Sequence, residues 1–137
     1  MLMGDELQQD LVQRALEARQ WAYAPYSNYR VGAALLADSG RVYTGVNVEN
    51  AAYPTGICAE RAAIYKAVSE GERQFQAIAV VTANGGMPCG ACRQALSEFG
   101  LETRVIVADE QGRILLETDV ASLLPGAFRP EHLNGRR

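Results

Sequence analysis

The sequence predicts an α/β fold, namely a three-layer α/β/α sandwich around a mixed sheet of about five strands. Segments with helical periodicity alternate with short apolar segments, and this order is typical of a sheet that carries helices on both faces. The segment 77–82 is apolar on both of its faces, as expected of a central strand. A length of 137 residues suits one domain, so we expect residues 1–137 to form a single unit.

The first three predicted elements are a helix and two strands. Apolar residues recur at helical spacing over about 5–23, and the segment 24–29, with its proline and asparagine, breaks this pattern as a loop. The segments 31–37 and 42–48 are mostly apolar, and the turn-forming residues 38–40 lie between them. We therefore expect two strands joined by a tight turn.

Three helices and three strands complete the predicted sandwich. An irregular stretch, 50–56, precedes a helix over about 58–70, which ends at Gly71. The strand 77–82 leads through a glycine-rich loop to a helix over about 90–99. The remaining elements are strands at 104–108 and 113–117, paired across the turn 109–112, and a short helix at 120–124 that stops at Pro125.

All three cysteines lie where two of these helices begin. Cys58 opens the first, and Cys89 and Cys92 form a C-x-x-C pair that opens the second. Helix N-termini stabilise thiolates, and strand–helix crossovers bring consecutive helix starts to one edge of a sheet. Three thiolates suit zinc but are one ligand short of a closed structural site. We therefore expect one Zn²⁺ per chain, with an open fourth position for a reactive water.

Other roles for these cysteines are open. They could be small buried hydrophobic residues, and a C-x-x-C pair at a helix start could be a thioredoxin-like redox pair. A redox pair would leave Cys58 without a role. A closed structural zinc site would need a fourth ligand, and the only histidine, His132, lies in the C-terminal tail. An open zinc site accounts for all three thiols.

Charged residues beside the expected ligands predict how such a site would work. Glu60 could be an ordinary acid in the first turn of a helix, but next to zinc it becomes a candidate general acid and base. Three thiolates give a zinc site a net negative charge, which an arginine bonded to a ligand sulfur would offset. Arg61, which starts the same helix as Cys58, is the preferred candidate, whereas Arg93 could equally be a solvated surface residue.

A polar pair precedes the Cys58 segment. Asn47 and Glu49 alternate with apolar residues, so they point to the same side of the chain. They could form the wet face of a half-buried strand, but they are also candidate hydrogen-bond partners for substrate hydroxyls. Tyr29 and Tyr53 flank the same region, where they could pack in a core or an interface, or stack on a planar base.

Composition argues against several classes of partner. The net charge is −3 at pH 7, whereas a domain that grips a nucleic-acid backbone is normally basic. The longest apolar runs are too short to span a bilayer, so no membrane partner is expected. No signal peptide is evident, and three cysteines without a disulfide framework fit a reducing compartment. We therefore expect a cytoplasmic protein.

Five motifs, in order, resemble the small, homotetrameric cytidine deaminase family over nearly the whole chain. The two metal segments, Cys58-Ala59-Glu60-Arg61 and Pro88-Cys89-Gly90-Ala91-Cys92-Arg93-Gln94, are similar to the zinc motifs of this class. The other three are the segment 26–34, which resembles the family's first motif, the segment 47–53, which resembles its nucleoside-binding segment, and the segment 123–128, which resembles its C-terminal motif.

The resemblance implies a zinc-dependent hydrolase. It would deaminate cytidine and deoxycytidine to uridine and deoxyuridine with release of ammonia, as in pyrimidine salvage. Cys58, Cys89 and Cys92 would bind zinc, Glu60 would shuttle protons, and Arg61 would support the thiolates.

The resemblance also implies a set of substrate contacts. Asn47 and Glu49 would hold the ribose, and the backbone amide of Ala59 would contact the pyrimidine. Tyr29 stands where the family usually has phenylalanine, and Met87 replaces a frequent serine. In a homotetramer of this kind, residues such as Ala51, Tyr53 and Phe128 reach neighbouring subunits' sites. The substrate-binding residues implied are Tyr29, Asn47, Val48, Glu49, Asn50, Ala51, Ala52, Tyr53 and Ala59.

Other functions remain open at this point. A deaminase of cytosine-nucleoside antibiotics, of the blasticidin S type, shares both metal motifs, although it lacks an acid at the place of Glu49. A nucleic-acid-editing deaminase is disfavoured by the acidic net charge. A zinc-stabilised interaction module is disfavoured by the open coordination and by Glu60.

Overall fold

Five strands form one mixed sheet in the order β2-β1-β3-β4-β5 in the computed structural model, which describes residues 4–133. The pairs β1–β2, β1–β3 and β4–β5 are antiparallel, and β3–β4 is parallel. The predicted mixed sheet is therefore confirmed. The strands are β1 (Gly32–Ala37), β2 (Val42–Val46), β3 (Phe75–Val81), β4 (Arg104–Ala108) and β5 (Ile114–Asp119).

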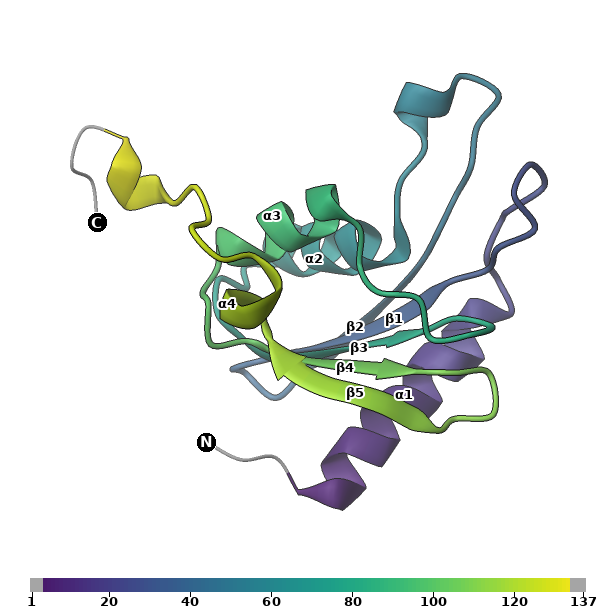
Figure 1. Cartoon of the computed structure of the whole chain (residues 1–137), viewed down its shortest axis with the longest axis horizontal. Helices are drawn as coiled ribbons and strands as arrows, with labels where there is room; N and C mark the ends of the chain where they lie inside the picture. Colours follow the sequence, from purple (N-terminus) through teal and green to yellow (C-terminus); the bar gives the residue numbers. More distant parts are fainter. Residues whose placement is uncertain (1–3, 134–137) are drawn as a thin grey trace.

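Helices cover both faces of the sheet, which confirms the three-layer sandwich (Figure 1). The helix α1 (Asp5–Arg19) lies on one face, and α2 (Ala59–Ser69), α3 (Gly90–Ser97) and the short α4 (Val120–Leu123) lie on the other. Between residues 4 and 133, no helix has both the length and the apolar character needed to cross a membrane.

Among the segments that extend away from the sandwich, two contain short 3-10 turns (Figure 1). One connects β2 to α2 and contains a 3-10 turn, η1 (Tyr53–Thr55), within the stretch predicted to be irregular. The other follows α4 and contains η2 (Pro130–His132), which was not predicted. Both segments carry side chains that matter for the site described below.

Several predicted boundaries were wrong by two or more residues, and two of these errors have the same cause. The first helix ends at Arg19 rather than near 23, and β2 ends at Val46 rather than 48. Tyr23 forms a single parallel bridge to Val48, which also bridges Ile57. Because Tyr23 and Val48 form these isolated bridges, neither residue continues the helix or the regular strand that precedes it.

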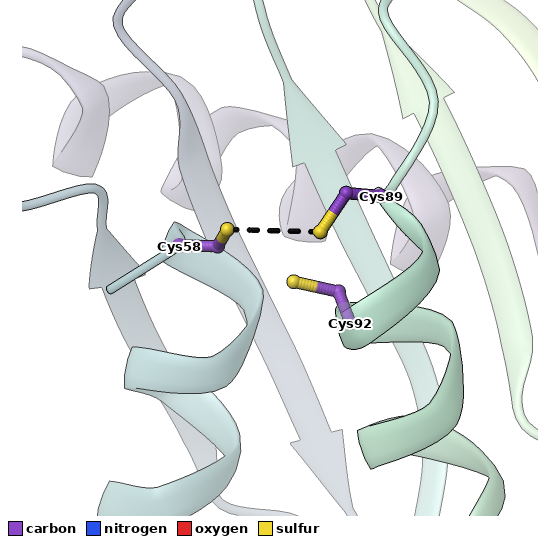
Figure 2. Close-up of side chains that lie close together, drawn as sticks. All are labelled: Cys58, Cys89 and Cys92. Atoms are coloured by element: carbon purple, nitrogen blue, oxygen red, sulfur yellow. Dashed lines mark hydrogen bonds between the residues drawn. The ribbon is translucent and has the colours of Figure 1, made fainter. Parts of the chain in front are cut away.

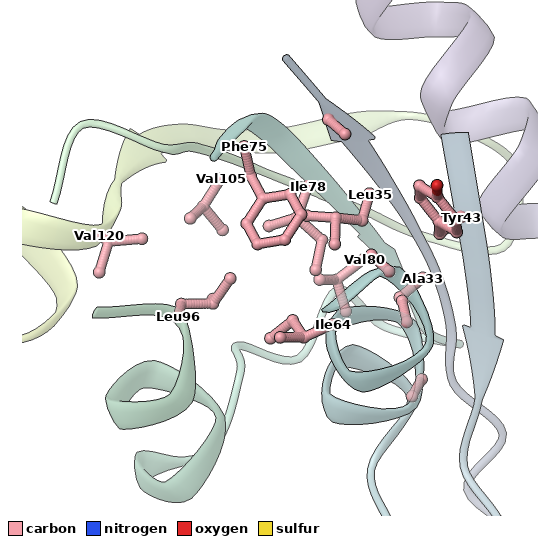
Figure 3. Packing of buried hydrophobic residues seen from close by; sticks show 14 of the residues in the cluster. Ala33, Leu35, Tyr43, Ile64, Phe75, Ile78, Val80, Leu96, Val105 and Val120 are labelled. Atoms are coloured by element: carbon pink, nitrogen blue, oxygen red, sulfur yellow. The ribbon is translucent and has the colours of Figure 1, made fainter. Parts of the chain in front are cut away.

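One hydrophobic cluster lies on each face of the sheet. On the α1 face, Leu11 and Ala15 pack against strand residues such as Ala79. On the opposite face, Ile64 of α2 and Leu96 of α3 pack against the strands (Figure 3). Residues 77–81 of β3 are buried throughout, as expected of a central strand covered on both faces.

Gly45 allows α2 to approach the sheet closely. A Cβ built on Gly45 in β2 would lie 2.5 Å from the Ala59 carbonyl oxygen and 2.6 Å from the Ala63 nitrogen. No side chain fits in that space, so only glycine permits this spacing. Because Cys58 directly precedes α2, Gly45 helps to set where the first expected metal ligand lies.

Candidate metal centre and adjoining cavity

The three cysteine sulfurs lie within 4.8 Å of one another at the starts of two neighbouring helices. Cys58 is the N-cap of α2, Cys89 is the N-cap of α3, and Cys92 lies in the first turn of α3 (Figure 2). The Sγ atoms of Cys58 and Cys89 are 3.8 Å apart, although the residues are 31 positions apart in the chain. The structure thus brings together the three residues that the sequence predicted to meet.

Arg61 contacts this cluster. Its Nη2 donates to Cys58 Sγ at 3.5 Å. Hydrogen bonds from Cys92 and from Arg61 lower the pKa of Cys58 to about 5, although burial acts in the opposite direction. The Arg61 Nε is buried and has no hydrogen-bond partner within residues 4–133. A guanidinium placed in this way stabilises a thiolate at Cys58.

Glu60 is buried at the start of α2, beside the sulfurs. Only 4% of its surface is exposed. Burial raises the pKa of the carboxyl group, and the negative charge of Cys58 acts in the same direction. A carboxyl group with a raised pKa holds a proton more readily than an exposed glutamate does, which suits a group that must take up and release protons.

A cavity of about 610 Å³ adjoins Glu60 and the sulfurs of Cys58 and Cys89. Its walls come from the loop 26–31, the segment 47–57, the start of α2 and the loop before α3. Of the residues predicted to bind substrate, those that line this cavity are Tyr29, Asn47, Val48, Glu49, Asn50, Tyr53 and Ala59.

Four residues of the predicted site do not line this cavity, namely the expected metal ligand Cys92 and the residues Ala51, Ala52 and Phe128. Sequence reasoning did not assign Tyr26, Ser27 or Ile57, which do line it. No periodicity or charge pattern marks the first two, because they lie in an irregular loop. Their membership of the 26–34 motif was the only signal for them.

Asn47 joins the loop 26–31 to the end of β2. Its Oδ1 accepts a hydrogen bond from the Val31 N–H at 2.9 Å, and its Nδ2 donates to the Tyr29 carbonyl at 2.8 Å. The residue is buried, with 9% of its surface exposed. Asn47 is therefore a structural support of the cavity wall, which the alternation of polar residues did not predict.

Glu49 holds the same loop through its carboxylate. The backbone N–H groups of Tyr26 and Ser27 donate to Oε1 at 2.9 and 3.1 Å, and the Ser27 hydroxyl donates to Oε2. These hydrogen bonds lower the pKa of Glu49. The largest contribution comes from the Ser27 hydroxyl group, and the two backbone N–H groups lower the pKa further. Glu49 is thus an anion on the cavity wall at neutral pH.

Arg93 is bonded to the protein, which argues against the solvated surface residue that was one of its two open alternatives. Its Nε donates to the Pro88 carbonyl at 2.8 Å, and its Nη1 donates to the Leu123 carbonyl at 2.9 Å. These two bonds join the loop before Cys89 to α4. Arg93 therefore supports the C-x-x-C segment through its backbone.

Replacing Arg93 by methionine should lower the free energy of unfolding by about 2 kcal/mol. Methionine keeps an unbranched stem but removes two charge-assisted hydrogen bonds in a partly buried place. Urea unfolding followed by circular dichroism measures the change. The matched control is Arg14→Met, which removes an exposed ion pair with Asp10 and should cost less than about 1 kcal/mol. Equal losses in the two variants would contradict the supporting role of Arg93.

Comparison with known proteins gives one consistent result. The family model described as the cytidine and deoxycytidylate deaminase zinc-binding region matches residues 5–108. The cytidine deaminase of Halalkalibacterium halodurans is 50% identical over 129 residues, which cover 92% of this chain and 97% of that protein. The cytidine deaminase of Sporosarcina psychrophila is 48% identical over 126 residues, covering 90% of this chain and 93% of that protein.

Solved structures are similar over nearly the same range. The crystal structure of cytidine deaminase from Burkholderia pseudomallei has a TM-score of 0.82 and 45% identity, covering 92% of this chain and 100% of that chain. The cytidine deaminase structure from Mycobacterium tuberculosis has a TM-score of 0.79 and 40% identity, covering 92% and 98%. The range 5–108 matched by the family model contains the three cysteines, Glu60 and the loops around the cavity.

Proposed function

This chain belongs to the cytidine and deoxycytidylate deaminase zinc-binding family, and on this premise we propose that it hydrolyses cytidine and deoxycytidine to the corresponding uridines. Ammonia is the second product. The observation that carries the proposal is a cluster of three cysteine sulfurs that, through Cys58 and Cys89, adjoins the same cavity as the buried Glu60 carboxyl group.

The donor set fits zinc. Three thiols at two helix N-termini are soft ligands, and Arg61 would offset part of the negative charge that they carry as thiolates. Cys58 and Cys89 also line the cavity, so the site is open toward a substrate. Bound zinc would supply a Lewis acid that makes water nucleophilic at neutral pH. Because free thiols persist in a reducing compartment, we propose a cytoplasmic enzyme.

Glu60 would carry the protons of the reaction. Its carboxylate would accept a proton from the attacking water and deliver it to N3 of the pyrimidine while oxygen adds to C4. It would then move the proton of the new hydroxyl group to the amino group, which leaves as ammonia. The raised pKa of Glu60 supports this role, because both protonation states must be accessible.

The cavity wall supplies contacts for the rest of the nucleoside. The backbone N–H of Ala59 lies in the first turn of α2, where it has no partner within the helix, and it would donate to the pyrimidine carbonyl. Glu49 and Asn47 would receive the sugar hydroxyls through lone pairs and N–H groups beyond those that hold the loop 26–31. Tyr29 and Tyr53 present aromatic surface to the same space.

We propose a homotetramer as the active form. The two segments that extend from the sandwich carry Tyr53, which is 75% exposed, and Phe128, which is 56% exposed. Exposed aromatic residues of this kind are typical of interfaces. Phe128 would complete a neighbouring subunit's site, since it does not line its own chain's cavity. Sedimentation should give a mass near four times 14.8 kDa, and a fully active monomer would contradict the proposal.

A substrate panel tests the activity. The zinc-loaded protein is incubated with cytidine, deoxycytidine, CMP and blasticidin S, and loss of the cytosine absorbance is followed. We expect reaction with the two nucleosides only. Reaction with blasticidin S alone would indicate the antibiotic deaminase. If no compound reacts although each chain holds one zinc ion, the protein is better explained as a zinc-stabilised interaction module.

A further inference from the structure

The hydroxyl group of Tyr29 is bonded within the protein. Its oxygen donates to Oδ1 of Asn84 at 2.8 Å, across 55 positions of sequence. Asn84 lies in the loop between β3 and α3, and this loop also carries Met87 and Cys89. Tyr29 and Met87 both line the cavity. The hydrogen bond therefore joins two walls of the cavity that come from distant parts of the chain.

The loop on the Asn84 side is anchored to the end of β3. The Gly86 N–H donates to the Thr82 hydroxyl at 2.7 Å, and that hydroxyl donates to Asn84 Oδ1 at 3.5 Å. Thr82 is almost fully buried. On the other side, the Tyr29 carbonyl accepts from Asn47. Tyr29 thus connects a fixed point at the end of β2 with a fixed point at the end of β3.

Gly86 leaves room for the Tyr29 hydroxyl. A Cβ built on Gly86 would overlap the hydroxyl oxygen, whereas the next nearest atom, Cζ of the same ring, lies at 3.4 Å. Gly86 does not adopt a left-handed backbone conformation, so alanine could follow the same backbone path. The hydroxyl group is therefore the main obstacle to a side chain at position 86.

We propose that Tyr29, Asn84 and Gly86 form a latch that holds the loop 83–89 against the loop 26–31. In this latch the Tyr29 hydroxyl is a positioning group, committed to Asn84 and not to the sugar of the substrate. Its effect on catalysis rests on the proposed function. The latch sets the separation of Met87 from the wall formed by Asn47 and Glu49, so it should act on substrate affinity more than on the chemical step.

Steady-state kinetics with cytidine test the positioning role. Tyr29→Phe should raise KM roughly two- to tenfold, the size expected for one net hydrogen bond, with a smaller change in kcat. Asn84→Ala should raise KM by a similar factor. The double variant should have a KM no higher than that of either single variant, because both single variants and the double variant remove the same hydrogen bond. The matched control is Tyr65→Phe, since Tyr65 is exposed on α2 and does not line the cavity.

Two kinetic outcomes would overturn the latch. Additive losses in the double variant would show that the Tyr29 hydroxyl acts independently of Asn84. An effect of Tyr29→Phe that is present with cytidine and absent with deoxycytidine would show that the hydroxyl group contacts the sugar.

Thermal unfolding of the zinc-loaded protein gives a second test that needs no substrate. Gly86→Ala should lower Tm by roughly 5 to 10 °C when Tyr29 is present, because the new methyl group overlaps the hydroxyl. In the Tyr29→Phe background the same substitution should cost much less. Equal losses in both backgrounds would overturn the latch. If Tyr29→Phe reduces the Tm loss caused by Gly86→Ala but the protein does not deaminate cytidine, the proposed function is contradicted and the latch is still supported.

Discussion

Replacing Glu60 by glutamine should lower kcat by roughly 100- to 10,000-fold while one zinc ion stays bound per chain. Glutamine has nearly the same shape, but its amide group cannot act as a general base or a general acid. Because Glu60 is buried and its pKa is already raised, removal of the charge should cost little stability. Steady-state kinetics with cytidine and a colorimetric zinc assay measure the two quantities on the same preparation.

The matched control for this variant is Glu17→Gln. Glu17 is exposed on α1, on the opposite face of the sheet, so kcat should be unchanged. Near-normal turnover in Glu60→Gln with zinc bound would contradict the proton-transfer role. Loss of zinc from that variant would instead indicate that the carboxyl group supports the metal centre.

Removal of zinc should abolish activity and lower the unfolding temperature by roughly 10 °C. A ligand present at about a thousand times its Kd stabilises the folded state by about 4 kcal/mol, and for a chain of this length each kcal/mol shifts Tm by a few degrees. The protein is treated with a strong chelator and examined by calorimetry. Added zinc should restore both activity and Tm.

Two variants distinguish the effect of losing zinc from other effects of the chelator. Cys58→Ala should hold no zinc and should therefore show no further change in Tm with chelator. Arg61→Ala should bind zinc roughly 10- to 100-fold more weakly, because its guanidinium contacts the Cys58 sulfur. Full activity after complete removal of zinc would contradict a catalytic role for zinc at this site.

The parts of the fold that the sequence predicted well are those with strong local patterns. β4 has the predicted bounds, Arg104–Ala108, because a short apolar segment between turns has few alternatives. The ends of α1 and β2 were misplaced, since the bridge between Tyr23 and Val48 depends on a long-range pairing. No window of sequence around either residue contains that information.

The candidate site, like the fold, has features that the sequence predicted and features that it did not. The meeting of the three cysteines could be predicted, because each lies at a helix start and the crossovers bring these starts together. The hydrogen bonds of Asn47 and Arg93 could not, because both end on backbone carbonyls of loops. Where a loop carbonyl lies depends on the completed fold, and so these supporting roles became visible only in the structure.

Gly45 has a consequence for engineering this protein. Substitutions of glycine by alanine within strands are a common route to thermostable variants. Here the added methyl group would collide with the backbone of Ala59 and Ala63, and α2 would have to shift as a rigid unit. That shift would carry Cys58 away from Cys89 and change the coordination geometry. Gly45 has no functional group, yet a substitution there would change the expected metal site. It should therefore be left unchanged in any attempt to stabilise the protein.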